Sequence, residues 1–251
     1  MAAVLLTFTA VRDAAGRRED ALLIADGRIL AVDRAARLRR PGLAERHLPG
    51  VAVPGLRDAH MHPVGHAAAL RRLSLAAAPD LDAVRAAVAD AAAAQPPGCA
   101  VVALRLDDEA LAEGRLPDRE LLDLAAPGRP VLVVRHCGHI AVASTAALEA
   151  AGLGPDSPDP EGGSLDRDER GRPTGVLRET AVAPVAAALG PFLPPLEPDH
   201  LVAAVGSLAG LGITGLGAIV STDQGLWGGS GSELDLVLAA APDLSLPLRV
   251  L

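Results

Sequence analysis

The sequence contains no lysine, because all 23 of its basic residues are arginine. Schiff-base chemistry, a P-loop lysine and a carboxylated-lysine metal bridge are therefore excluded within this chain. Aromatic residues are almost absent as well: 251 residues include two Phe, one Trp and no Tyr. The core must be built from Leu, Val, Ile and Ala, without the large buried areas that aromatic rings supply.

Cysteine is scarce, and acidic residues outnumber basic ones by 31 to 23. The net charge of −8 comes with no basic stripe, which argues against nucleic acid or an anionic membrane as a partner. Cys99 and Cys137 are far apart and form no CxxC motif, so we expect no disulfide framework and a reducing, cytoplasmic location. The N-terminus, "MAAVLLTFTAVRD", lacks a positive leader region and predicts a first strand instead of a signal peptide.

One segment resembles a membrane span. Residues 201–220, "LVAAVGSLAGLGITGLGAIV", carry no charge and contain a GxxxG motif at Gly206 and Gly210. The same stretch is rich in glycine, and "GLGIT" is typical of a helix end followed by a buried strand. We favour the second interpretation and expect no membrane partner.

The first fifty residues indicate β-structure. In "ALLIADGRILAV", two apolar runs are joined by Asp26-Gly27, the dipeptide that suits a type I′ hairpin turn. "RHLPGVAVPG" predicts a further short strand, bounded by Pro-Gly pairs.

Short apolar runs alternate with Ala-rich helical stretches after residue 55. Helices are expected after Asp80 and Ser232, whose side chains suit helix N-caps. This alternation predicts a parallel sheet covered on both faces. Residues 155–175, rich in Pro, Gly and Asp, predict a long polar loop of the kind that often covers a site. The strands are expected at 100–106, 130–136, 175–177, 212–220 and 246–251.

The stretch "PGLRDAHMHP" places His60 and His62 two positions apart. On a strand such side chains share a face, so two imidazoles can converge on one metal ion at about 2.0–2.1 Å. On a helix they would diverge, and Pro63 marks where the strand must stop. The pair would then lie at the C-terminal end of a parallel strand, where α/β barrels place their chemistry. A chance HxH at an exposed strand end remains the alternative.

Longer motifs extend this pattern over most of the chain. "VPGLRDAHMHP" with "DGRILAV" upstream resembles the signature that opens the first barrel strand of the amidohydrolase superfamily. "RHCGHIAVASTAALEAAGL" and "DPEGGSLDRDERGRPTGVLRETA" resemble the amidohydrolase family 3 branch, which includes enzymes similar to N-substituted formamide deformylase. Arg57 and the "VAS" at 142–144 depart from that pattern.

The resemblance implies an α/β fold: a partial (β/α)8 TIM-type barrel over residues 54–251, preceded by part of a small β-sandwich over 1–53. It also implies a divalent metal, with zinc expected, held by His60, His62 and Glu179. The alternative for Glu179 is a carboxylate at a helix N-terminus, where the helix dipole favours negative charge.

His139 matches a histidine that would bind substrate, although a structural role is an equal alternative. His66 is expected at the surface or behind the ligands, and no motif assigns His136, His200 or His47. A Cys137/His nucleophile is disfavoured because neighbouring residues on a strand face opposite ways. Asp58 is expected to brace either the strand that carries the histidine pair or one of the ligands.

The resemblance covers only the N-terminal half of the family's pattern. The chain stops in an apolar strand, "SLPLRVL", so we expect a fragment whose general-base aspartate lies beyond Leu251. The expected activity is hydrolysis of a small amide, formamide or cyclic amide by metal-activated water. The expected protein partner is a second copy or a complementary C-terminal half. The alternative is a non-catalytic remnant or interaction module.

Overall fold

The computed structural model describes residues 3–13, 16, 18–222 and 232–251. The chain divides into two units, each with its own dense internal contacts. The first comprises Met1–Arg57 with Gly212–Thr214, and the second comprises Asp58–Leu211 with Gly215–Leu251. Trp227 lies outside the described residues.

The first unit is built on one mixed sheet with the order β3-β2-β1-β4, and β5 also pairs with β1. The predicted hairpin is confirmed, because β2 and β3 are antiparallel and Asp26 (φ 50°) and Gly27 (φ 71°) both adopt the left-handed backbone of a type I′ turn. Leu5, Ala21 and Ala35 form its small core. The sandwich remains a prediction. The elements are β1 (Val4–Arg12), β2 (Arg18–Ala25), β3 (Arg28–Asp33), α1 (Ala35–Leu38), β4 (Ala44–His47) and β5 (Val51–Ala52).

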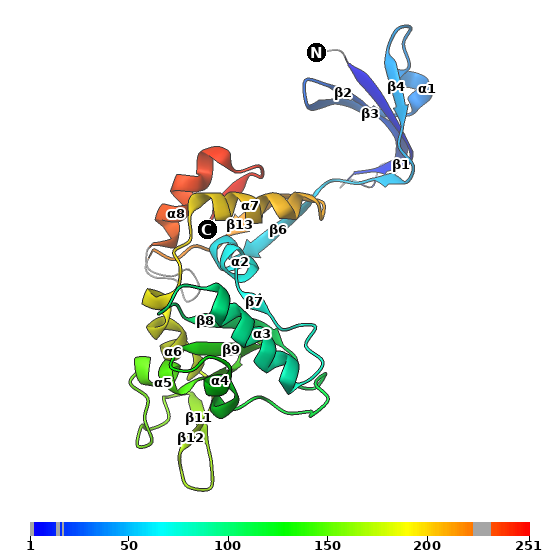
Figure 1. Cartoon of the computed structure of the whole chain (residues 1–251). Coiled ribbons are helices and arrows are strands. Elements are labelled where there is room, and N and C mark those ends of the chain that lie inside the picture. Colours follow the sequence, from blue (N-terminus) through cyan, green and yellow to red (C-terminus); the bar gives the residue numbers. More distant parts are fainter. Residues whose placement is uncertain (1–2, 14–15, 17, 223–231) are drawn as a thin grey trace. The chain divides into compact units, whose positions relative to one another are not determined.

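A six-stranded sheet with the order β11-β12-β10-β9-β8-β7 forms the larger part of the second unit (Figure 1). Strands β7, β8 and β9 run parallel, as expected. The expectation of an all-parallel sheet is wrong beyond β9, where each successive pairing is antiparallel. The strands are β7 (Leu73–Ser74), β8 (Val101–Leu106), β9 (Val131–Arg135), β10 (Ile140–Ala143), β11 (Gly163–Arg167) and β12 (Pro173–Glu179).

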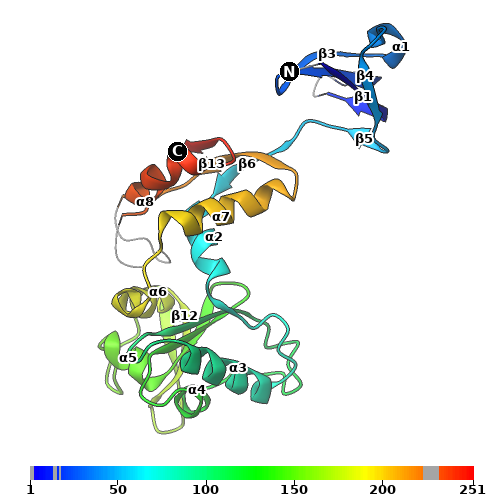
Figure 2. The same cartoon turned by 45° about the horizontal axis from the view of Figure 1, so that its top comes forward.

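Both faces of this sheet are covered by helices, as predicted. α3 (Leu81–Ala94) and α4 (Arg119–Ala125) pack on one face, where Val101 and Ala103 of β8 are buried. α5 (Thr145–Ala150) and α6 (Val182–Ala188) pack on the other, where Val102 is buried. Alternate side chains of β8 therefore point to opposite faces of the sheet and pack into two separate hydrophobic cores. Figures 1 and 2 show α3 and α4 together on one side of the strands.

The predicted loop at 155–175 instead contains most of a β-hairpin, β11–β12. Polar residues predominate in this segment, but Leu165, Pro173 and Gly175 are buried. Leu165 is 4% exposed, and Arg178 pairs across the two strands with Asp166, Nη2 to Oδ2, at 2.7 Å. The antiparallel ladder, the cross-strand ion pair and the buried leucine together account for order in a segment whose composition is typical of a loop.

A separate three-stranded sheet, with the order β14-β13-β6, carries the histidine pair. α7 and α8 lie beside this sheet in both views (Figures 1 and 2). Because 201–220 contains the end of α7 followed by β13, the interpretation as a helix and a strand is confirmed. Within the described part of the chain, no helix is long and apolar enough to cross a membrane. The elements are β6 (Leu56–Met61), α2 (Pro63–Leu70), η1 (Gly190–Phe192), α7 (Pro198–Ala209), β13 (Ile213–Ala218), α8 (Glu233–Ala240), η2 (Ala241–Asp243) and β14 (Leu248–Val250).

The core around α4 yields a matched test of packing. Leu122 is 0% exposed, whereas Leu124 in the same helix is 75% exposed. Leu122→Ala should lower the free energy of unfolding by about 2–5 kcal/mol, because it removes buried methyl groups and leaves a cavity. Leu124→Ala should change that free energy by less than about 0.5 kcal/mol in urea titrations. Equal effects of the two changes would contradict this packing.

Candidate metal and substrate site

The histidine pair lies where β6 ends and α2 begins. His60 is the penultimate residue of the strand, and Pro63 occupies the first turn of the helix, so the strand stops where the sequence predicts. The ring centroids of His60 and His62 are 5.5 Å apart and the rings meet edge to face at 62°. Both side chains are exposed. The two imidazoles are therefore neighbours and open to a ligand.

Asp58 braces this strand, as expected from its position ahead of the pair. Its Oδ1 accepts a hydrogen bond of 2.9 Å from the backbone N–H of His60. On the other side, the N–H of Ile219 after β13 donates to the carbonyl oxygen of Met61 at 2.7 Å. The backbone on both sides of the pair is thus held by specific hydrogen bonds.

Glu179 and His139 form a second pair. Glu179 ends β12 with a left-handed backbone (φ 53°), and its N–H donates to the carbonyl oxygen of His139 at 2.7 Å. The side chains also meet, with His139 Nδ1 and Glu179 Oε2 2.8 Å apart. The hydrogen bond to the Glu179 carboxylate and its charge raise the pKa of His139 above the ordinary value. Since α6 begins only at Val182, Glu179 lies ahead of its first turn.

The predicted site residues are therefore brought together as two pairs. Nowhere in the described residues do three His, Cys, Asp or Glu side chains come close enough to hold a metal ion together. His60 and His62 suit two ligands of a metal ion by their chemistry and proximity. Glu179, the third predicted ligand, is not grouped with them in the described structure, and its carboxylate is hydrogen-bonded to His139.

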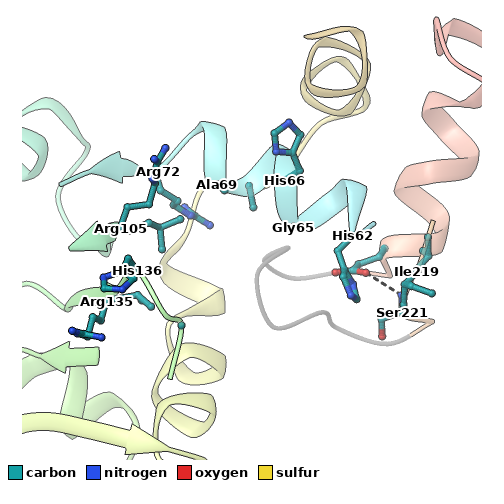
Figure 3. A pocket seen from close by; sticks show the side chains of 16 residues that line it. His62, Gly65, His66, Ala69, Arg72, Arg105, Arg135, His136, Ile219 and Ser221 are labelled. Atoms are coloured by element: carbon teal, nitrogen blue, oxygen red, sulfur yellow. Dashed lines mark hydrogen bonds between the residues drawn. The ribbon is translucent and has the colours of Figure 1, made fainter. Parts of the chain in front are cut away.

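A cavity of about 750 Å³ opens beside the histidine pair. His62 and Ser221 lie on one side, and Arg72, Arg105 and His136 lie on the other (Figure 3). The remaining lining residues include His66, Arg135, Ile219 and Glu233. His139 and Glu179 are not among the residues that line it.

Glu233 is a functional candidate that the sequence interpretation missed. It is the first residue of α8 and only 8% exposed. Its Oε2 accepts a hydrogen bond of 3.0 Å from the backbone N–H of Ser221. The helix dipole favours a carboxylate at this position. The only indication in the sequence was Ser232, which predicted the start of a helix at this point but not a functional side chain at Glu233.

The other histidines and Cys137 have local roles or positions that motifs did not assign. His200 accepts a hydrogen bond from the N–H of Glu197 at 2.9 Å, and His47 meets Thr7 at 3.1 Å. His66 lines the cavity from α2, and its Nε2 is buried without a hydrogen-bond partner in the described part of the chain. Cys137 lies in the exposed turn between β9 and β10, not on a strand.

Comparison with known proteins agrees with this architecture. The model of a family described as "Amidohydrolase family" matches residues 50–251. YtcJ of Bacillus subtilis (strain 168) is 30% identical over 205 residues, which are 80% of this chain and 39% of YtcJ. N-substituted formamide deformylase of Arthrobacter pascens is 32% identical over 175 residues, 67% of this chain and 32% of the deformylase. This chain thus spans well under half the length of these relatives.

Two solved structures share the fold. The uncharacterized metal-dependent hydrolase from Pyrococcus horikoshii OT3 has a TM-score of 0.62 at 18% identity, covering 99% of this chain and 48% of its own. The corresponding protein from Pyrococcus furiosus has a TM-score of 0.64 at 20% identity, covering 99% of this chain and 49% of its own. At these identities the likeness concerns the fold.

The His139–Glu179 contact predicts a titration that mutagenesis can reverse. Glu179→Gln should lower the pKa of His139 toward its ordinary value, since the imidazolium loses its charged partner. Because the pKa is raised in the folded state, the contact stabilises that state fully below the unfolded pKa of about 6.5. The stabilisation is lost as pH rises through the folded value. NMR titration of the ring carbons measures this shift in metal-free protein.

Glu161→Gln is the matched control for that titration. It removes a carboxylate that has no part in the shift of the His139 pKa, while the backbone carbonyl of Glu161 keeps its hydrogen bond from Thr180. The pKa of His139 should be unchanged in this variant. An unchanged value in Glu179→Gln as well would contradict the contact.

Proposed function

This chain belongs to the amidohydrolase family, and from that premise we propose that it supplies the N-terminal part of a metal-dependent hydrolase. The proposed reaction is hydrolysis of the C–N bond of a small amide, formamide or cyclic amide other than a peptide. The name of the Arthrobacter relative supports that substrate class. The observation that carries the proposal is the neighbouring pair of exposed imidazoles, His60 and His62, at the end of a strand.

His60 and His62 are the proposed first two ligands of a divalent metal, with zinc as the expected ion. Imidazole nitrogens are ligands that zinc accepts readily, and the pair needs no rearrangement of β6 to present both rings to solvent. The backbone bonds to Asp58 and Ile219 would hold the two rings in place as an ion binds. When bound, such a metal supplies Lewis-acid polarisation of a carbonyl and lowers the pKa of a water ligand toward about 7.

Glu179, which is not grouped with His60 and His62 in this structure, is proposed to join them as the third ligand when a metal binds, and His139 is the proposed substrate-binding group. A carboxylate has two oxygens, and the hydrogen bond to His139 uses only Oε2. Ligating carboxylates are themselves commonly hydrogen-bonded, which keeps them oriented. His139 is exposed beside Glu179 and could donate a proton or a hydrogen bond to an amide.

The general base is proposed to be an aspartate on a strand outside this chain. It would take the proton of the attacking water and pass it to the leaving nitrogen. The partner that supplies it would be a C-terminal part of the hydrolase. A non-catalytic role is the second candidate, and it is favoured by the lack of a third donor beside the histidine pair in the described residues.

Zinc binding by the full 251-residue chain tests the proposal. Equilibrium dialysis of the chain against zinc, followed by atomic absorption, should show bound metal. His60→Ala/His62→Ala should reduce the bound zinc to background, because both nitrogen ligands are lost. Glu179→Gln should weaken zinc binding, because a neutral amide is a poorer ligand than a carboxylate.

His47→Ala/His200→Ala is the matched control, because it also removes two histidines. Both lie outside the cavity and are engaged with Thr7 and Glu197. This variant should bind as much zinc as the unaltered chain. If all variants bound the same amount of zinc, the assignment of the ligands would be wrong. If the unaltered chain bound no zinc, the non-catalytic candidate would be favoured.

A further inference from the structure

A second, smaller pocket lies in the same unit as the candidate site but shares none of the proposed metal ligands. It is found where the ends of α2 and α3 meet the start of β8, and residues between η1 and α7 complete its wall. Its volume is about 150 Å³. Sites for drug-sized ligands measure roughly 300–1,000 Å³, so this pocket suits an ion or a small polar group.

Backbone hydrogen bonds build the walls of the small pocket. Leu73, one of its lining residues, belongs to β7, which pairs with β8. The N–H of Ala100 donates to the carbonyl oxygen of Phe192 at 2.8 Å, which ties the segment after η1 to the start of β8. The N–H of Arg72 donates to the carbonyl oxygen of Ala69 at 3.2 Å, at the end of α2. The pocket is therefore part of the fold, because paired backbone groups fix its lining.

Two arginines in this wall have no acidic partner in the part of the chain that the structure describes. Arg71 and Arg72 follow the last turn of α2, and neither guanidinium belongs to any ion pair formed by the described residues. Partial burial lowers the pKa of Arg72, and the neighbouring charge of Arg71 lowers it further. An anion in the pocket would offset both effects, since it would attract two adjacent guanidinium groups that now repel each other.

Gln95 adds a hydrogen-bond acceptor to the same pocket. It is the C-cap residue of α3, and it lines the pocket together with the two arginines. Its Oε1 is shielded from solvent and has no hydrogen-bond partner among the described residues. A buried acceptor without a donor is destabilising, and such groups are rare in folded proteins. The pocket therefore suits an anion that also carries an O–H group.

This combination of donors and an acceptor distinguishes between anions. A carboxylate or a sulfate has only acceptor oxygens when it is ionised, so it could bind the arginines but would repel the oxygen of Gln95. A hydrogenphosphate ion has acceptor oxygens for the guanidinium groups and one P–OH that can donate. Among common small anions, hydrogenphosphate therefore matches all three side chains.

We propose that the small pocket binds inorganic hydrogenphosphate, with Arg71 and Arg72 donating to its oxygens and Gln95 accepting from its P–OH. This site is separate from the proposed hydrolase function, because His60, His62 and Glu179 do not line it. Arg72 also lines the larger cavity that His62 borders (Figure 3). A bound hydrogenphosphate would neutralise Arg72 and so reduce the positive charge of that cavity wall.

NMR titration of the metal-free full chain with inorganic phosphate, at constant ionic strength, tests the site. At about pH 8, above the second pKa of phosphate, the hydrogenphosphate dianion keeps one O–H and carries the same charge as sulfate. Phosphate should bind about tenfold more tightly than sulfate, because only phosphate can donate to Gln95. The methyl phosphate dianion has no O–H and should bind like sulfate. The amide signals of Arg72 and Gln95 should shift as phosphate binds.

Three variants separate the contributions of the lining side chains. Arg72→Gln should weaken the binding of both anions about tenfold, and Arg71→Gln should weaken it about threefold, since solvent screens the more exposed charge. Gln95→Met removes the acceptor at similar side-chain length. It should leave sulfate binding unchanged and abolish the preference for phosphate.

Arg105→Asn is the matched control, because Arg105 lines the larger cavity but not the small pocket. Asparagine tolerates the left-handed backbone of this position (φ 65°). This variant should bind phosphate as the unaltered chain does. The inference is overturned if the unaltered chain binds phosphate no more tightly than sulfate or methyl phosphate. It is also overturned if Gln95→Met keeps the preference, or if Arg105→Asn loses as much affinity as Arg72→Gln.

Discussion

The pairing of β13 with the end of β6 is the constraint on which the candidate site depends. The side chains of β6 contribute little burial, so backbone hydrogen bonds must hold the strand that presents His60. Gly217 makes the close pairing possible, because a Cβ at this position would lie 2.5 Å from the carbonyl oxygen of Ala59. The bond from Ile219 to Met61 then fixes the backbone between the two histidines. A short glycine-containing strand thus positions two imidazoles that would otherwise sit on an unsupported edge.

Strained backbone marks the ends of two strands in the larger sheet. Outside the Asp26 hairpin turn, the non-glycine residues with positive φ in the described chain are Arg105 and Glu179. Each such conformation costs on the order of 1–3 kcal/mol, and neighbouring buried side chains can offset it. Leu106 follows Arg105 and Leu177 precedes Glu179, and both leucines are fully buried. The sheet therefore anchors each strand end through a leucine while a charged side chain is directed away from the core.

Local patterns predicted the elements well, and they predicted contacts between distant elements poorly. The apolar runs at β8, β9 and β13, the cap at Asp80 and the I′ turn depend on neighbouring residues, and the structure confirms them. The antiparallel pairings beyond β9 depend on which strands meet, which no short-range pattern specifies. The family resemblance identified the histidine pair, but Arg72, Arg105 and Glu233 are separated by long stretches of sequence and become neighbours of one cavity only through the fold. An arginine within the apolar run "AVVALRL" was the one available signal for Arg105.

The histidine pair and the two cavity arginines, Arg72 and Arg105, favour ligands of opposite charge. A divalent cation at His60 and His62 would be favoured by the excess of acidic residues in the chain and by Glu233 in the cavity wall. The same cation would be disfavoured by Arg72 and Arg105 unless an anion lay between them. The charge held at one wall of the cavity therefore changes the charge that the opposite wall can hold, so His62 and the two arginines have to be considered together.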